Sequence, residues 1–203
     1  MKHEYRKHEK NVYGPSTKPS LIEVPKMSYI SIKGKGNPNS SDFKHKIEAL
    51  FSCAYTIKMF PRNGVTIPNY NDYTVYPLEG VWDLSDKGRL EESLNKDELI
   101  YTIMIRQPDF ITEEIFKLAQ EKCKHKNDEI KDIEFIFSKP SSCVQMMHIG
   151  PFDTEAESFK SIHAFCEMMG LKRKSLIHRE IYLSDFRKTK VESVKTILRI
   201  DVL

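Results

Sequence analysis

The order in which helices and strands are predicted along the chain constrains its fold more than any other feature. The first half is predicted to contain a strand at 24–33, a helix from Ser41 or Asp42 to about residue 60, and strands at 73–82 and 99–106. The second half is predicted to contain a strand at 143–149, a helix from Thr154 to Gly170, and strands at 176–184 and 196–203. The sequence therefore predicts an α+β fold of two side-by-side β-α-β-β modules, with helices on one sheet face and a ligand groove on the other.

The helix of the second half has a capping signal at each end. Thr154 and Glu157 have the spacing of a capping box, and Gly170 is typical of a helix C-terminus. Between the two halves, Thr112 is expected to cap a further helix, which is followed by a short strand at 133–137. We interpret this segment as a connector.

The length of 203 residues suits one domain, predicted over 21–203. Its parts are a first module at about 21–110, a connector at about 111–140 and a second module at about 141–203. Residues 1–20 carry five Lys or Arg against two Glu, which equals the net charge of +3 of the whole chain. We predict that they form a basic, solvated and flexible tail.

No secretory signal or long apolar run is present in the sequence, which predicts a cytoplasmic protein with no membrane partner. The four cysteines, Cys53, Cys123, Cys143 and Cys166, lie in apolar patterns and have no metal-binding spacing, so we expect them to be reduced and buried. Gly34-Lys35-Gly36 lacks the third glycine of a dinucleotide loop. We therefore predict no cofactor and no metal.

Polar side chains on the strand at 176–184 are the first candidates for a site. Because side chains alternate along a strand, one face is expected to carry Ile177, Arg179, Ile181 and Leu183, and the other His178, Glu180 and Tyr182. The first set is mostly apolar and should face the helices. Glu180 and Tyr182 then point away from that core, either to bulk water or into a groove.

The strand at 73–82 has similar chemistry, since Glu79 lies beside Tyr76 and the only tryptophan, Trp82. Aromatic walls attract flat apolar or cationic ligands, and a carboxylate among them can hold a donor or a positive charge. Two such strands favour a shared pocket, although Trp82 would equally suit plain core packing. His148 is a weaker candidate, because a lone histidine in such a pattern is more often a hydrogen-bonded core or edge residue.

Five segments together resemble the stand-alone GyrI-like proteins, which are related to the effector domains of multidrug-responsive transcription regulators. These segments are AYTIKMF (54–60), VYPLEGVW (75–82), HIGPFD (148–153), HREIYLSD (178–185) and TILR (196–199). The likeness runs from about Leu21 to the C-terminus. The first 20 residues are too few for a helix-turn-helix, so we do not expect direct transcriptional control.

The resemblance implies two β-α-β-β modules with a cleft between them that binds hydrophobic, often aromatic or cationic compounds. Glu180 and Tyr182 match the strand at the floor of the drug pocket, while Trp82 and Glu79 match the opposing strand. Tyr76, His148 and Tyr55 complete the predicted ligand-binding residues. Some stand-alone relatives are similar to hydrolases that open the cyclopropane ring of DNA-alkylating natural products.

The sequence is compatible with three functions. The first is a module that binds a small hydrophobic ligand, for sequestration or detoxification. The second is a hydrolase of electrophilic aromatic compounds, with Glu180 as the base, Tyr182 as the acid or hydrogen-bond donor, and Trp82 and Tyr76 as a stacking wall. The third is an inhibitory partner of a nucleic-acid enzyme such as a gyrase-type topoisomerase. Direct binding of nucleic acid is not expected, because the basic tail lacks the density of basic residues that a nucleic-acid-binding arm has.

Overall fold

A computed structural model describes residues 2–185 and 188–203 of the chain, which divides into two compact units. The first unit contains residues up to His3, Met27–Leu78 and Asp83–Ser138. The second unit contains Glu4–Lys26, Glu79–Trp82 and Lys139–Leu203. The α+β class is confirmed, but the units differ from the modules expected at 21–110 and 141–203. Two segments from the first half of the chain belong to the second unit, and the expected connector belongs almost entirely to the first.

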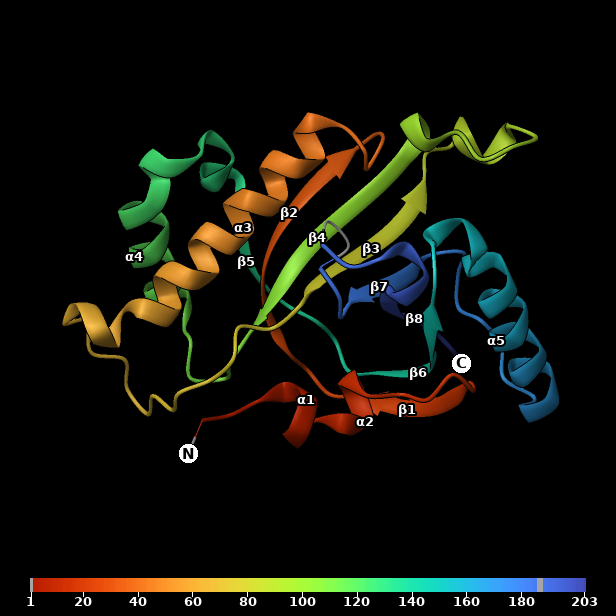
Figure 1. The fold of residues 1–203 in the computed structure, drawn as a ribbon, viewed down its shortest axis with the longest axis horizontal. Coiled ribbons are helices and arrows are strands. Elements are labelled where there is room, and N and C mark those ends of the chain that lie inside the picture. Colours follow the sequence, from red (N-terminus) through yellow and green to blue (C-terminus); the bar gives the residue numbers. More distant parts are fainter. Residues whose placement is uncertain (1, 186–187) are drawn as a thin grey trace. The chain divides into compact units, whose positions relative to one another are not determined.

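In the first unit, two helices accompany an antiparallel group of strands in the order β4-β2-β5. These elements are β2 (Ser28–Lys35), α3 (Ser41–Met59), β4 (Leu99–Gln107), α4 (Glu113–Cys123) and β5 (Glu134–Phe137). Helix α3 lies along β2 and β4 (Figure 1). Its cap is neither Ser41 nor Asp42, as predicted, but Ser40, whose Oγ accepts a hydrogen bond from the Phe43 N–H at 3.2 Å.

In the second unit, the strands follow the order β1-β6-β8-β7-β3. The elements of this unit are α1 (Tyr5–His8), α2 (Lys10–Tyr13), β1 (Ser20–Val24), residues 79–82 of β3 (Leu78–Leu84), β6 (Ser141–Ile149), α5 (Glu155–Met169), β7 (His178–Tyr182) and β8 (Lys195–Asp201). Strand β6 pairs antiparallel with β1 and β8, and β8 pairs antiparallel with β7.

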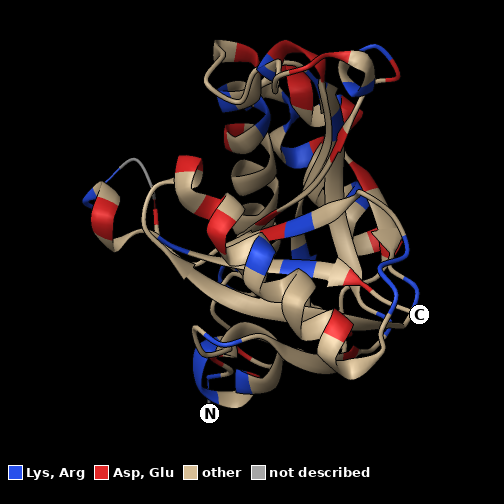
Figure 2. Ribbon diagram, turned by 90° about the vertical axis from the view of Figure 1, so that its right-hand side faces the viewer, with Lys and Arg blue, Asp and Glu red and all other residues tan. Residues whose placement is uncertain are grey.

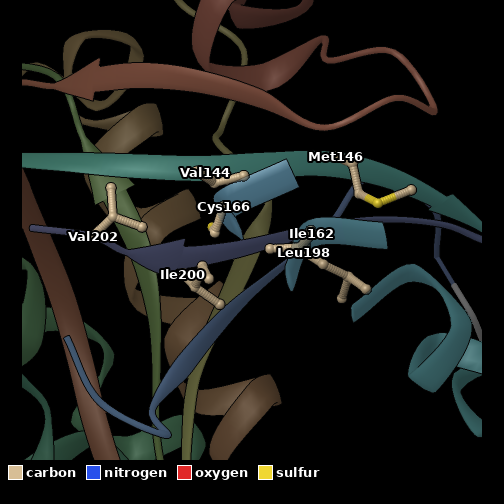
Figure 3. Close-up of a cluster of buried hydrophobic side chains, with 7 residues drawn as sticks. All are labelled: Val144, Met146, Ile162, Cys166, Leu198, Ile200 and Val202. Carbon is tan, nitrogen blue, oxygen red and sulfur yellow. The ribbon is translucent and has the colours of Figure 1, made fainter. Parts of the chain in front are cut away.

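Helix α5 packs on one face of these strands and forms the apolar core of the second unit with them (Figure 3). Alternate residues of β6 and β8, such as Val144 and Leu198, are fully buried there against Ile162 and Cys166 of α5. Gly170 adopts a left-handed conformation at the end of α5, as predicted, with a φ of 68°.

The capping box predicted at the start of α5 is not formed. The Thr154 side chain caps no backbone N–H; instead, its hydroxyl donates to the Pro151 carbonyl at 2.8 Å. A short 3₁₀ helix at Phe152–Thr154 precedes α5, so the chain enters the helix from an already coiled turn.

The opposite face of the same strands contacts the N-terminal segment. Gln145 and Arg199 are paired across β6 and β8, so their side chains lie on one face. The Arg199 guanidinium donates to the Val12 carbonyl at 2.8 Å, and the Gln145 amide donates to the Asn11 carbonyl at 2.9 Å. Helices α1 and α2 therefore cover this face.

The prediction of a solvated, flexible tail over residues 1–20 is consequently wrong for α1 and α2. Tyr5, Val12 and Tyr13 are 5%, 4% and 2% exposed. Basic residues occupy much of this short segment near the N-terminus (Figure 2), yet its apolar residues are buried against the strands. Net charge alone did not reveal this packing, because a basic segment can bury one face and hydrate the other.

Candidate functional site

Strand β7 is covered on both of its faces within the second unit. Glu180 lies opposite Leu198 of the α5 core, whereas Arg179 lies opposite Arg199 beneath α1 and α2. The expectation that Glu180 and Tyr182 point away from the helix-packed core is therefore wrong. Alternation correctly separated the two faces, but it could not tell which face meets α5, because both faces are covered.

Four side chains of β3 and β7 form a continuous hydrogen-bonded group, called here the Glu180 cluster: Trp82, His178, Glu180 and Tyr182. The Trp82 indole Nε1 donates to the Tyr182 hydroxyl at 2.9 Å, and this hydroxyl donates to Glu180 Oε2 at 2.8 Å. His178 Nε2 lies 3.1 Å from the other oxygen, Glu180 Oε1. Glu180 is only 8% exposed, so both of its carboxylate oxygens are held by this group in a largely dry environment.

Two phenylalanines close the cluster on the α5 side. The Phe152 ring meets the Tyr182 ring edge-on at 6.0 Å, and the Phe159 ring meets the His178 ring edge-on at 5.0 Å. Phe152 is 41% exposed, so an apolar surface borders the polar group where it approaches solvent. The cluster therefore combines aromatic rings with a buried carboxylate.

A glycine in β3 is required by this packing. A Cβ atom at Gly80 would lie 2.6 Å from Trp82 Nε1 and 3.1 Å from the Tyr182 hydroxyl. Gly80→Ala is expected to displace the indole, break its hydrogen bond to Tyr182 and lower the free energy of unfolding by about 1–3 kcal/mol. Denaturant unfolding together with the Trp82 emission maximum checks this, and wild-type values for both would contradict the close contact.

The surroundings of the Glu180 cluster favour the protonated, neutral forms of Tyr182 and Glu155. Burial first, and then the Glu180 charge and hydrogen bond, raise the pKa of Tyr182 well above its ordinary value. Glu155, the first residue of α5, is also buried, and its pKa is raised to about 9 by burial, then by Glu180 and Asp153. Tyr182 and Glu155 are thus held as proton-bearing groups beside Glu180 at neutral pH.

Glu79 does not join the cluster, although it is close to Trp82 in sequence. It is fully buried, where Arg179 Nη1 donates to its Oε2 at 2.8 Å and the Tyr13 hydroxyl donates to its Oε1 at 3.2 Å. Arg179 and Tyr13 belong to the face that α1 and α2 cover. The structure therefore does not bring Glu79 together with Trp82, and its contacts are those of a buried ion pair.

Comparison with known proteins places this fold in a family. The model of the GyrI-like small-molecule-binding domain matches residues 17–203. The chain belongs to the GyrI-like family. A hydrolase from Listeria innocua is similar to this GyrI-like chain, with 36% identity, a TM-score of 0.90 and 100% of both chains covered. An uncharacterized conserved protein from the same organism is 37% identical, with a TM-score of 0.90 over 99% of this chain and 100% of the other.

The fold extends to more distant structures. The EcmrR C-terminal domain has 14% identity and a TM-score of 0.57, covering 92% of this GyrI-like chain and 97% of its own. No match was found among curated proteins. Within residues 2–185 and 188–203, no helix is long and apolar enough to cross a membrane.

The remaining predicted site residues of this GyrI-like chain have separate surroundings. His148 is 5% exposed, and its ring nitrogens lie 2.9 Å from the Ser158 hydroxyl and 3.0 Å from the Pro151 carbonyl, so it positions the start of α5. Tyr76 is buried in the first unit, where the Arg106 guanidinium lies 4.6 Å from its ring centre. Tyr55 lies on α3 and is 54% exposed.

Sequence reasoning missed Glu155 and Phe152, which complete the surroundings of Tyr182. In the sequence, Glu155 looks like an ordinary acidic residue in the first turn of a helix, where such residues are common and solvated. The motif HIGPFD (148–153) is part of the GyrI-like resemblance and contains Phe152, so this motif could have indicated Phe152 as a site residue. Only the packing of α5 on β7 shows that these residues lie beside Glu180.

Proposed function

We propose that this protein binds a small aromatic ligand, neutral or cationic, through the Glu180 cluster, for sequestration or detoxification. Membership of a small-molecule-binding family supplies the general function. The observation that supports the finer proposal is that Tyr182 and His178 both contact one buried carboxylate, Glu180, while Trp82 donates to the Tyr182 hydroxyl.

The chemistry of the cluster explains this ligand class. An aromatic ligand would stack or meet edge-on with the Trp82, Tyr182 and Phe152 rings, with a contact energy of about 0.5–1.5 kcal/mol per pair beyond area burial. A donor or positive charge on that ligand would be stabilised by Glu180 in its low-dielectric surroundings. Apolar bulk with one polar anchor is the usual composition of a small-molecule site.

Fluorescence of the single tryptophan tests this binding directly. Titration with biphenyl, quinoline and acridine compounds should quench Trp82 saturably. Because the ligand would lose a charge-assisted contact, Glu180→Gln is expected to weaken the binding of amino-substituted compounds about tenfold or more. Glu192→Gln, at an exposed position, is the matched control and should bind like the wild type. Equal affinity of Glu180→Gln and wild type for every compound would remove Glu180 from the site.

Hydrolysis is a second candidate, favoured by the unbroken hydrogen-bonded chain from Trp82 to Glu180. A hydrolase from Listeria innocua is similar to this protein over the whole length of both chains. In the ring opening of a cyclopropane conjugated to a carbonyl, Glu180 would take a proton from water as the water oxygen bonds to the ring carbon. The breaking C–C bond would send its electron pair to the carbonyl oxygen, which Tyr182 would stabilise by a hydrogen bond and which then takes up a proton.

Product mass separates the two candidates. Incubation with a cyclopropane-bearing alkylator should give a product heavier by one water if the protein is a hydrolase, at a rate reduced about 100-fold or more by Glu180→Gln. Saturable binding with the compound recovered unchanged would support sequestration alone.

A further inference from the structure

A second group of polar and aromatic side chains surrounds Lys58, wholly within the first unit, and shares no residue with the Glu180 cluster. Lys58 is in the last turn of α3, where its Nζ contacts an Asp72 carboxylate oxygen and donates to the Tyr70 hydroxyl at 3.2 Å. The Tyr70 hydroxyl donates to the same Asp72 oxygen at 3.2 Å. One amine, one phenol and one carboxylate are therefore in mutual contact.

Three aromatic rings border the Lys58 amine. The rings of Tyr70, Tyr73 and Phe110 meet one another edge-on, with centres 5.5–6.4 Å apart. The Lys58 Nζ lies 4.8 Å from the centre of the Tyr73 ring. Tyr73 is buried, and its hydroxyl has no hydrogen-bond partner in the part of the chain that the structure describes. The amine therefore lies beside a largely apolar wall that contains one unsatisfied polar atom.

The amine is buried only in part, so small molecules can reach it. The Lys58 side chain is 15% exposed, and the Asp72 side chain beside it is 47% exposed. Solvent therefore reaches the amine on its Asp72 side, while the buried Tyr73 ring covers another side. Such a place, open on one side and lined with aromatic rings on the other, suits a small aromatic molecule.

The surroundings of Lys58 favour its neutral, nucleophilic form. Burial first, and then the charges of Lys2 and Arg62, lower its pKa, and the half-exposed Asp72 carboxylate does not outweigh them. An amine with a lowered pKa is the usual nucleophile of lysine chemistry with carbonyl compounds. Burial raises the pKa of Tyr70, so its hydroxyl keeps its proton at neutral pH.

We propose that Lys58 captures small aromatic aldehydes as a reversible Schiff base. This function is additional to ligand binding at the Glu180 cluster and does not depend on it. The electron pair of the neutral Nζ forms a bond to the carbonyl carbon, and the π pair of the C=O bond moves to the oxygen, which takes up a proton. The carbinolamine then loses this oxygen as water, when the nitrogen electron pair forms the C=N bond. Addition of water reverses the capture and releases the aldehyde.

The side chains in contact with the amine have roles in these steps. The Tyr70 hydroxyl is placed to give a proton to the carbonyl oxygen, and Asp72, which contacts both groups, is placed to accept the proton that leaves the nitrogen. The rings of Tyr73 and Phe110 would contact the ring of the aldehyde. Each such contact favours an aromatic aldehyde over an aliphatic one by about 2- to 10-fold.

Trapping with cyanoborohydride tests the inference on the full chain, because this reagent reduces the imine to a stable amine at neutral pH. Benzaldehyde is the probe, butanal is the aliphatic comparison, and peptide mapping locates the alkylated lysines. Lys58→Arg keeps the positive charge but lacks the reactive amine. Lys46→Arg is the matched control on the same helix: Lys46 is 12% exposed, and although burial lowers its pKa, hydrogen bonds to Glu129 and Asp42 raise it above the ordinary value.

In the wild type and in Lys46→Arg, benzaldehyde should alkylate Lys58 about tenfold or more faster than the other lysines, and faster than butanal does. Tyr70→Phe should slow this alkylation several-fold without changing the labelling of the other lysines. Alkylation of Lys58 at the same rate as the other lysines, or equally fast with both aldehydes, would overturn the inference. Quenching of Trp82 by other ligands, measured on the same samples, reports the Glu180 cluster separately, so failure of one function is distinguishable from failure of the other.

Discussion

Glu79→Gln is expected to lower the free energy of unfolding by about 3–5 kcal/mol, because it removes one partner of a buried ion pair. Glu79 is fully buried and accepts a hydrogen bond from Arg179 at 2.8 Å. Its charge also counters the burial that lowers the pKa of Arg199, which is 3% exposed. The amide would remove the carboxylate charge that Arg179 contacts and that favours the charged form of Arg199.

Denaturant unfolding at pH 7 measures this loss, with Glu192→Gln as an exposed control in the same unit. The double variant Glu79→Gln, Arg179→Gln should recover part of the stability, because it removes one of the two positive charges that repel each other. A loss below about 1 kcal/mol in the single variant would contradict a structural ion pair and reopen the ligand-binding role predicted for Glu79.

Glu155→Gln should have the opposite effect and raise the free energy of unfolding at pH 7 by about 3 kcal/mol. The pKa of Glu155 is about 9 in the folded protein, against an ordinary value of 4.5. Between these values only the folded state binds the proton, so the free energy of unfolding falls as the pH rises. Below pH 4.5 both states carry the proton, and the folded protein incurs no such penalty.

Glutamine has no proton to lose, so the variant should lack this pH dependence between pH 5 and 9. Urea unfolding across that range, with Glu157→Gln as the matched control, measures the difference between the two slopes. Equal slopes for wild type and Glu155→Gln would mean that Glu155 is ionised in the folded protein.

Both predictions depend on which face of β7 each residue lies against, because Glu79 contacts Arg179 and Glu155 lies near Glu180. The sequence determined these faces only in part. Period-two alternation correctly put His178, Glu180 and Tyr182 on one face and Arg179 on the other. The motifs around Glu180 and Trp82 also indicated the GyrI-like family, which the comparison confirmed over residues 17–203. These features are local, because they depend on spacing along a single strand and on short runs of residues.

The tertiary structure decided what covers each face. Helix α5 lies over Glu180, while the N-terminal helices, predicted as a flexible tail, lie over Arg179 and Glu79. Trp82 and Glu79 are three positions apart in β3, so the pleat directs them to opposite faces. Glu155 became a candidate only through the packing of α5 on β7, because burial and the nearby Glu180 charge are properties of residues distant in the chain, and no local pattern encodes them.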